Sequence, residues 1–288
     1  MFKNLSAGAI GIRGLNLAQT IDLARQIGFG GIDFDIVEAA QLADTYGIEY
    51  VRNLFAEAGV RPGQWGLPVA WNKDDQWEKD LEKLPKLAAL GQALGCTRTA
   101  TWCLSGSNER PFKENWAWHV ARFQPIARIL ADYGCRLGIE FLGPKTIRAR
   151  FKYEFIYTLG GMMALAREIG DNVGLLLDAW HWFTSGDGLD ALDTLSAQDV
   201  ITVHVNDAPP GLSLDAYVDN DRRLPMETGV IPLPALLKKL HALGYDGPIT
   251  PEPFSKRIND VAAQDALAAG LLIAEYMRRL WQAAGLEN

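Results

Sequence analysis

The sequence has little of what marks membrane, secreted or nucleic-acid-binding proteins. No apolar run reaches the roughly 20 residues that a membrane-spanning helix needs. The N-terminal stretch MFKNLSAGAIGI lacks the apolar core of a signal peptide. Acidic residues outnumber basic ones by 35 to 28, and the net charge of −7 argues against a nucleic-acid surface, which needs a basic stripe. We therefore expect a cytoplasmic protein without a membrane or nucleic-acid partner.

Cysteine is also scarce. Cys96, Cys103 and Cys135 are an odd number without the spacing of a zinc site, and two of them open apolar, strand-like runs. Such cysteines are typically buried free thiols. With 48% apolar and 22% charged residues among 288, the chain can build a large core, and no shift in composition marks a second domain.

Short apolar runs alternate with amphipathic stretches along the whole chain. The predicted strands cover residues 5–12, 31–37, 60–67, 96–104, 135–142, 173–180, 199–206 and 248–254. The predicted helices cover residues 16–28, 39–58, 76–94, 114–133, 158–169, 187–195, 232–243 and 261–284. Because each helix must carry the chain back before the next strand, this alternation requires a parallel sheet.

Eight strand–helix units close into a barrel, so we predict an α/β fold, a single-domain (β/α)8 TIM barrel over residues 1–288. The alternative is an open, doubly wound sheet. That fold usually carries a Gly-rich phosphate turn after its first strand, and the stretch SAGAIGIRG matches such a turn poorly.

Four residues with metal-binding side chains stand at the ends of the last four predicted strands: Glu140, Asp178, His204 and Glu252. The carboxyl ends of barrel strands are where barrel enzymes keep their chemistry. Alternation along the strands sends Glu140, His204 and Glu252 toward the barrel axis, opposite the apolar faces. The strand that ends at Asp178 is apolar on both faces and does not decide its direction.

Three carboxylates and one imidazole suit a single hard or borderline cation, namely Mn2+, Co2+ or Mg2+, and Zn2+ is also compatible. Without a cation, the carboxylates would repel one another. The alternative is that each is a separate hydrogen-bonded or ion-paired residue. Asp207, close after His204, is a candidate to orient that imidazole.

Two long predicted connections, residues 143–157 and 207–231, lie on the same face and are typical of binding loops. Lys145 in the first is a candidate for binding substrate, or else a solvated loop lysine. Either Arg222 or Arg223 in the second could reach over the site, and spacing does not choose between them.

Nine tryptophans are many for this length. Trp65 and Trp102 lie near strand ends, where an indole could stack on a sugar ring or merely close the core. His181 follows Asp178 by three residues and could meet a substrate oxygen; the alternative is a rim histidine among aromatic residues.

Four motifs resemble the xylose isomerase-like barrel superfamily: Glu140 in GIEF, Asp178 to His181 in DAWH, His204 in HVND and Glu252 in PEPF. The segment 229–254 is similar to the sugar phosphate isomerase/epimerase group, near ketose 3-epimerases and inosose dehydratase. The resemblance implies one divalent cation on Glu140, Asp178, His204 and Glu252, commonly Mn2+, Co2+ or Mg2+. It also implies that Glu140 and Glu252 are the acid/base pair of a proton transfer through an enediolate. His181 and a loop arginine would hold substrate, although that arginine normally comes sooner after the histidine.

The leading hypothesis is therefore a metal-dependent sugar or polyol isomerase or epimerase with a small carbohydrate substrate. The same site could serve a lyase that eliminates a group beta to the carbonyl of a keto-sugar, keto-glycoside or keto-inositol. A metal-free glycoside hydrolase would use Glu140 and Glu252 but leave Asp178 and His204 without a role. A sugar-binding barrel without turnover is the fourth reading. Barrels of this kind often pair, so a homo-oligomer is compatible with the sequence.

Overall fold

Eight parallel strands close into a barrel in the computed structural model, which describes residues 1–286. The barrel strands are β1 (Phe2–Leu5), β2 (Gly31–Phe34), β3 (Arg61–Gly66), β4 (Arg98–Cys103), β6 (Arg136–Phe141), β8 (Val173–Asp178), β9 (Val200–Val205) and β10 (Pro248–Pro251). Each strand pairs with its neighbours along the chain, and β10 returns to pair with β1. This closure confirms the predicted single-domain TIM barrel.

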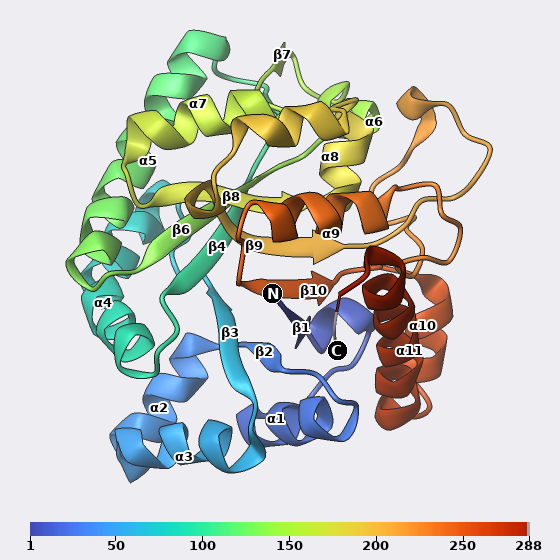
Figure 1. Cartoon of the computed structure of the whole chain (residues 1–288). Coiled ribbons are helices and arrows are strands. Elements are labelled where there is room, and N and C mark those ends of the chain that lie inside the picture. The colour runs from blue at the N-terminus through green and yellow to red at the C-terminus, as the bar shows by residue number, and fades with distance from the viewer. Residues whose placement is uncertain (287–288) are drawn as a thin grey trace.

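Helices surround the strands, as Figure 1 shows. They are α1 (Leu17–Gln26), α2 (Ile36–Tyr46), α3 (Ile48–Ala58), α4 (Asp74–Ala93), α5 (Phe112–Asp132), α6 (Lys145–Arg148), α7 (Leu159–Ile169), α8 (Ala179–Ser185), α9 (Leu233–Ala242), α10 (Lys256–Ala262) and α11 (Ala266–Ala284). The hydrophobic core lies between this outer layer and the barrel strands. The three cysteines are buried there as free thiols, as predicted.

The first predicted strand, 5–12, is wrong. The strand is β1, which ends at Leu5, and residues Gly8–Ile10 form a short 3-10 helix instead. Gly11, with a φ of 83°, ends that helix in a left-handed conformation that glycine adopts readily. The predicted helix 39–58 is also two helices, because Gly47, with a φ of 86°, separates α2 from α3.

Local structure also forms within the long connections. Residues 143–157 contain α6 and β7 (Tyr153–Glu154), and β7 pairs with β5 (Gly106–Ser107) from the connection after β4. The predicted helix 187–195 is only a 3-10 helix at Leu189–Thr194, preceded by α8 directly after β8. None of the helices within residues 1–286 has the length and apolar character needed to cross a membrane.

His119 of α5 is a buried histidine of the outer layer. Its Nδ1 lies 2.7 Å from the carbonyl oxygen of Asn115, and its ring stacks on Phe155 with centroids 4.8 Å apart. Burial lowers the pKa of His119 to about 4, so the imidazole is neutral at pH 7 and Nδ1 donates to that carbonyl.

We expect His119 to make the protein lose stability as the pH falls. The unfolded chain binds a proton here below about pH 6.5, whereas the folded protein does so only near pH 4. This difference should lower the free energy of unfolding by about 2 kcal/mol between pH 7 and pH 5. In urea unfolding measured in chelator, the free energy of unfolding of His119→Gln should change less with pH than that of the wild type. His241→Gln, at an exposed position of α9, is the control. Parallel curves for wild type and His119→Gln would contradict this expectation.

Candidate functional site

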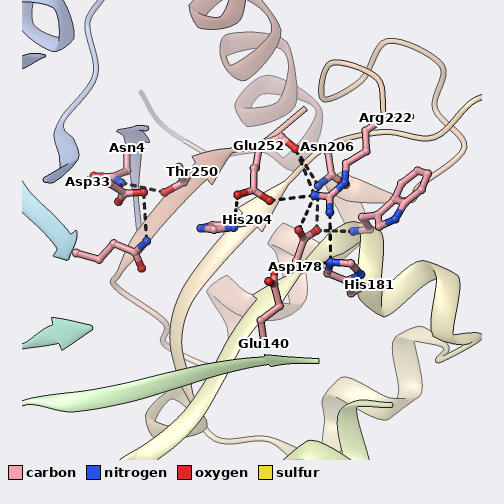
Figure 2. A network of polar contacts seen from close by, with 12 residues as sticks. Asn4, Asp33, Glu140, Asp178, His181, His204, Asn206, Arg222, Thr250 and Glu252 are labelled. Atoms are coloured by element: carbon pink, nitrogen blue, oxygen red, sulfur yellow. Dashed lines mark hydrogen bonds and ion pairs between the residues drawn. The ribbon is translucent and has the colours of Figure 1, made fainter. Parts of the chain in front are cut away.

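Four side chains meet at the carboxyl end of the barrel. Glu140 lies on β6, Asp178 ends β8, His204 lies on β9 and Glu252 directly follows β10. One potential ligand atom from each lies within 4.8 Å of the others. Figure 2 shows the four converging between the strands.

Strand register explains this convergence. Residues paired across neighbouring parallel strands point to the same face of the sheet. Asp178 is paired with His204, which in turn is paired with Thr250, two residues before Glu252. The pairing settles the direction of Asp178, which its apolar strand left open.

Asp178 also begins α8 and accepts hydrogen bonds through both carboxylate oxygens. Oδ1 accepts from the backbone N–H of Trp180 at 2.7 Å and from the amide of Asn206 at 2.9 Å. Oδ2 accepts from Arg222 at 2.8 Å. Asn206, in the HVND motif, was not among the predicted site residues, although its position next to the strand end is a signal that could have found it.

Arg222 is the cation of the site and is almost fully buried. Its Nη1 donates to Asp178 and, at 3.0 Å, to Oε2 of Glu252, while Nη2 donates to Asp219 at 2.8 Å. Its guanidinium also lies 4.9 Å from the ring centre of Phe254. The structure thus places Arg222, rather than Arg223, at the candidate ligands.

The long connection after β9 carries Arg222 into the barrel because it folds back on the strand end. Asp207 and Arg223 exchange two backbone hydrogen bonds of 2.9 and 2.7 Å in an antiparallel bridge. The carboxylate of Asp207 accepts four further backbone N–H groups, among them those of Thr228 and Ile231. Asp207 therefore holds the loop, and the prediction that it orients His204 is wrong.

The three carboxylates and their neighbours shift one another's ionisation. Burial raises the pKa of Glu140 well above its usual range, and the charges of Asp178 and Glu252 add to this effect. Burial alone would lower the pKa of His204, but Glu252, Glu140 and Asp178 raise it to about 10. Burial alone would raise the pKa of Asp178, but Arg222 holds it well below its usual range. The site therefore favours additional positive charge.

The donor atoms fit a bound cation. Oε1 of Glu140 and Nε2 of His204 are buried and have no hydrogen-bond partner, while Nδ1 of His204 lies 3.4 Å from Oε1 of Glu252. Buried polar atoms without partners are costly and call for an explanation such as an ion. Three carboxylates and an imidazole at this spacing are a donor set for one divalent metal.

His181 on α8 lies beside this cluster and is buried. Its Nδ1 accepts from the backbone N–H of Gly143 at 3.2 Å. Nε2 lies 4.0 Å from Glu140 and 3.2 Å from Nη2 of Arg222. Burial lowers the pKa of His181 to about 4, so the ring is neutral at pH 7.

Three other predicted substrate-binding residues have partners outside the four-residue cluster. Trp65 is fully buried against α4, because its indole N–H bonds to the carbonyl of Cys96 and its strand pairing turns it outward. Lys145 is half-exposed and its ammonium pairs with Asp215 at 2.5 Å, which joins the two long connections. Arg223 pairs with Asp221 at 2.7 Å. The burial of Trp65 corrects its assignment to the pocket, whereas substrate binding by Lys145 or Arg223 stays a prediction.

Trp102 does face the opening of the barrel. It is paired in register with Glu140, so both side chains point to the same face. Its side chain is 40% exposed and lies edge-on to Trp71, with ring centroids 5.4 Å apart. An exposed indole beside Glu140 can stack on a ring-shaped ligand.

A second polar cluster fills the barrel interior next to the four residues and was not predicted. The Asn4 amide donates to Asp33 at 2.5 Å and to Thr250 at 2.9 Å, and Gln64 donates to Asp33 at 3.2 Å. Figure 2 shows this cluster beside His204 and Glu252. Alternation in the strand GIDF could have identified Asp33 as an inward carboxylate.

The chain matches the family profile described as xylose isomerase-like TIM barrel over residues 21–276. The protein therefore belongs to that family, which confirms the predicted resemblance. An inosose isomerase from Halalkalibacterium halodurans is 25% identical over 143 residues, which make up 49% of this chain and 48% of that protein. The chain thus matches about half the length of this curated relative.

Several solved structures share the fold of this chain along nearly its whole length. A xylose isomerase domain protein from Alicyclobacillus acidocaldarius has a TM-score of 0.85 and 26% identity, with 98% of this chain and 99% of that one covered. The IOLI protein, solved with a zinc atom, has a TM-score of 0.76 and 18% identity, with 98% of each chain covered. D-psicose 3-epimerase has the same fold, with a TM-score of 0.72.

We expect Arg222→Gln to destabilise the metal-free protein by about 3–5 kcal/mol, because it leaves buried carboxylates without their partner. The adjacent Arg223→Gln is the matched control. It removes a partly exposed ion pair, for which a loss below about 1 kcal/mol is expected. Urea unfolding in chelator measures the free energy of unfolding of both variants. Equal decreases would show that the buried ion pairs of Arg222 stabilise the protein no more than the exposed pair of Arg223.

Proposed function

We propose that this protein is a divalent-metal-dependent isomerase or epimerase that moves a proton between carbons of a keto-sugar or keto-polyol. The observation that carries the proposal is the convergence of Glu140, Asp178, His204 and Glu252, whose donor atoms include two buried ones without hydrogen-bond partners, Oε1 of Glu140 and Nε2 of His204. The inosose isomerase relative and the fold shared with D-psicose 3-epimerase support the reaction class. The zinc in the IOLI protein supports a metal in this fold.

The four converging residues would hold the cation, which is Mn2+, Co2+ or Mg2+ in the proposal, with Zn2+ also compatible. When bound, it would polarise a substrate carbonyl and make the neighbouring C–H more acidic. Glu140 and Glu252 would form the acid/base pair. One carboxylate takes the proton from carbon, and the other returns a proton to a different carbon or to the opposite face.

Neighbouring groups would hold the substrate for this transfer. Nε2 of His181 lies 4.0 Å from Glu140, and Nε of Arg222 is a buried donor without a hydrogen-bond partner. Arg222 would donate to a substrate oxygen and His181 would contact one, which fixes the carbon near the carboxylates. Trp102 would cover the ring or chain from the side of β4.

Metal binding is expected to depend on His204 and to survive loss of His181. After chelation, adding Mn2+, Co2+, Mg2+ or Zn2+ at about 100 times its Kd should raise the Tm of the wild type by about 5–10 °C. His204→Gln should abolish that rise, because one of four ligands is lost. His181→Gln, a neighbouring buried histidine outside the ligand set, should keep it. The proposal fails if no metal stabilises the wild type.

Proton transfer is tested by incubating metal-loaded protein with keto-sugars and inososes in deuterated water. Isomerisation or epimerisation should replace a carbon-bound hydrogen with deuterium, seen by NMR and mass spectrometry, without loss of water. Glu140→Gln should lower this rate by about 10²–10⁴-fold with the fold intact. Glu57→Gln, at an exposed position of α3, should leave the exchange rate unchanged. Wild-type rates in Glu140→Gln would refute the assignment, and an unsaturated product would identify the lyase instead.

A further inference from the structure

A cavity of about 590 Å3 opens beside the candidate site, over the carboxyl ends of β1, β2 and β3. Residues at or just after these strand ends line it, including Ser6, Asp33 and Gly66. We call it the β1–β3 cavity. The candidate metal ligands come from β6, β8, β9 and the end of β10, so the cavity occupies the other side of the barrel opening.

Asp33 connects the cavity to the candidate ligands. Asp33 lines the cavity, and its carboxylate accepts from Asn4, which also donates to Thr250. Thr250 is paired in register with His204 and lies two residues before Glu252. Figure 2 shows Asp33, Asn4 and Thr250 as one group of contacts that lies next to His204 and Glu252. A substrate held at the four ligands can therefore extend over Asp33.

The buried groups of this region need hydrogen-bond donors. Oε1 of Gln64 is buried without a partner, while its amide nitrogen is bonded to Asp33. Oδ1 of Asn4, whose amide nitrogen is also bonded to Asp33, is likewise buried without a partner. An ionised carboxylate such as Asp33 only accepts. Hydroxyl groups of a ligand supply donors, whereas a phosphate dianion has none to give.

The charge of the cavity agrees with this chemistry. Asp33, Asp35 and Glu38 line it, and no lysine, arginine or histidine among residues 1–286 does. The nearby cation of the site, Arg222, is already paired with three carboxylates. An anionic group placed here would meet three carboxylates, against the exposed Arg13, whose Nη1 donates to the carbonyl oxygen of the lining residue Gly8 at 2.7 Å.

We propose that the β1–β3 cavity holds the part of the substrate that is remote from the reacting carbonyl. This part is an uncharged polyol that donates a hydroxyl hydrogen bond to Asp33, and sugar phosphates are rejected. The inference rests on the proposed function and specifies its substrate class. A cavity of about 390 Å3 on the side of β4 differs: it contains Arg110, stacked 4.5 Å from the ring centre of Trp118. A phosphate bound on that side is the outcome that contradicts the proposal.

Binding and turnover are measured separately on metal-loaded protein with D-fructose, D-tagatose and scyllo-inosose, and with the 6-phosphates of the two ketoses. Saturation-transfer NMR detects binding, and deuterium exchange detects turnover. At least one free polyol should bind, and its phosphate should bind or react at least about tenfold more weakly. Asp33→Asn should raise KM for the free polyol about tenfold with a smaller change in kcat, because it holds substrate away from the reacting carbon.

Val37→Lys is the converse variant. Val37 lines the same cavity and is 40% exposed, so a lysine there adds a cation without removing a polar contact. It should lower the ratio of affinities for free over phosphorylated ketose by about fivefold. Asp22→Asn, at an exposed position of α1, should leave this ratio unchanged. Equal or tighter binding of the phosphates, or no binding of any free polyol, overturns the inference. Binding of free polyols without exchange would refute the proposed reaction and leave the substrate class standing.

Discussion

The mutual repulsion of Glu140, Asp178 and Glu252 is the constraint around which the carboxyl end of this barrel is built. Their ligand atoms lie within 4.8 Å of one another and of His204, in surroundings where charge is poorly screened. Arg222 offsets part of this repulsion through Asp178 and Glu252. The remaining demand for positive charge appears in the raised pKa of His204, which burial alone would have lowered. A divalent cation would also offset this repulsion. The repulsion among the carboxylates, which opposes folding, would therefore favour binding of the metal in the proposed catalysis.

The charge balance of the site depends on a loop as well as on the strands. Arg222 comes from the connection after β9, and its position requires the backbone bridge between Asp207 and Arg223. The Asp207 carboxylate organises the turn that leads on to Ile231. A further ion pair, between Lys145 and Asp215, joins this loop to the connection after β6. Loop order and charge balance in the site are therefore coupled, and disturbing the loop should affect the site even where no candidate ligand is touched.

The barrel and the convergence of the site were predictable because both follow from periodicity. Alternation placed Glu140, His204 and Glu252 on inward faces, and the computed structure brings them together with Asp178. The direction of Asp178 depended on pairing with β9, which no single strand reveals. Trp65 was misplaced because position near a strand end does not determine the face, and its pairing turns it outward. The choice between Arg222 and Arg223 depended on a long-range backbone bridge, which leaves no periodic signal in the sequence.

The two sides of the barrel opening differ in the chemistry they offer. The strands β6, β8 and β9, with the end of β10, supply side chains that attract a cation, whereas β1 to β3 supply Asp33 and Gln64 as acceptors over an acidic cavity. Asn4 and Thr250 link the two sides where β1 meets β10 and the barrel closes. A change near Asp33 can therefore alter which substrate fits without moving the four converging side chains. This separation is a physical reason why one barrel framework could keep a metal-assisted proton transfer while its substrates diverge.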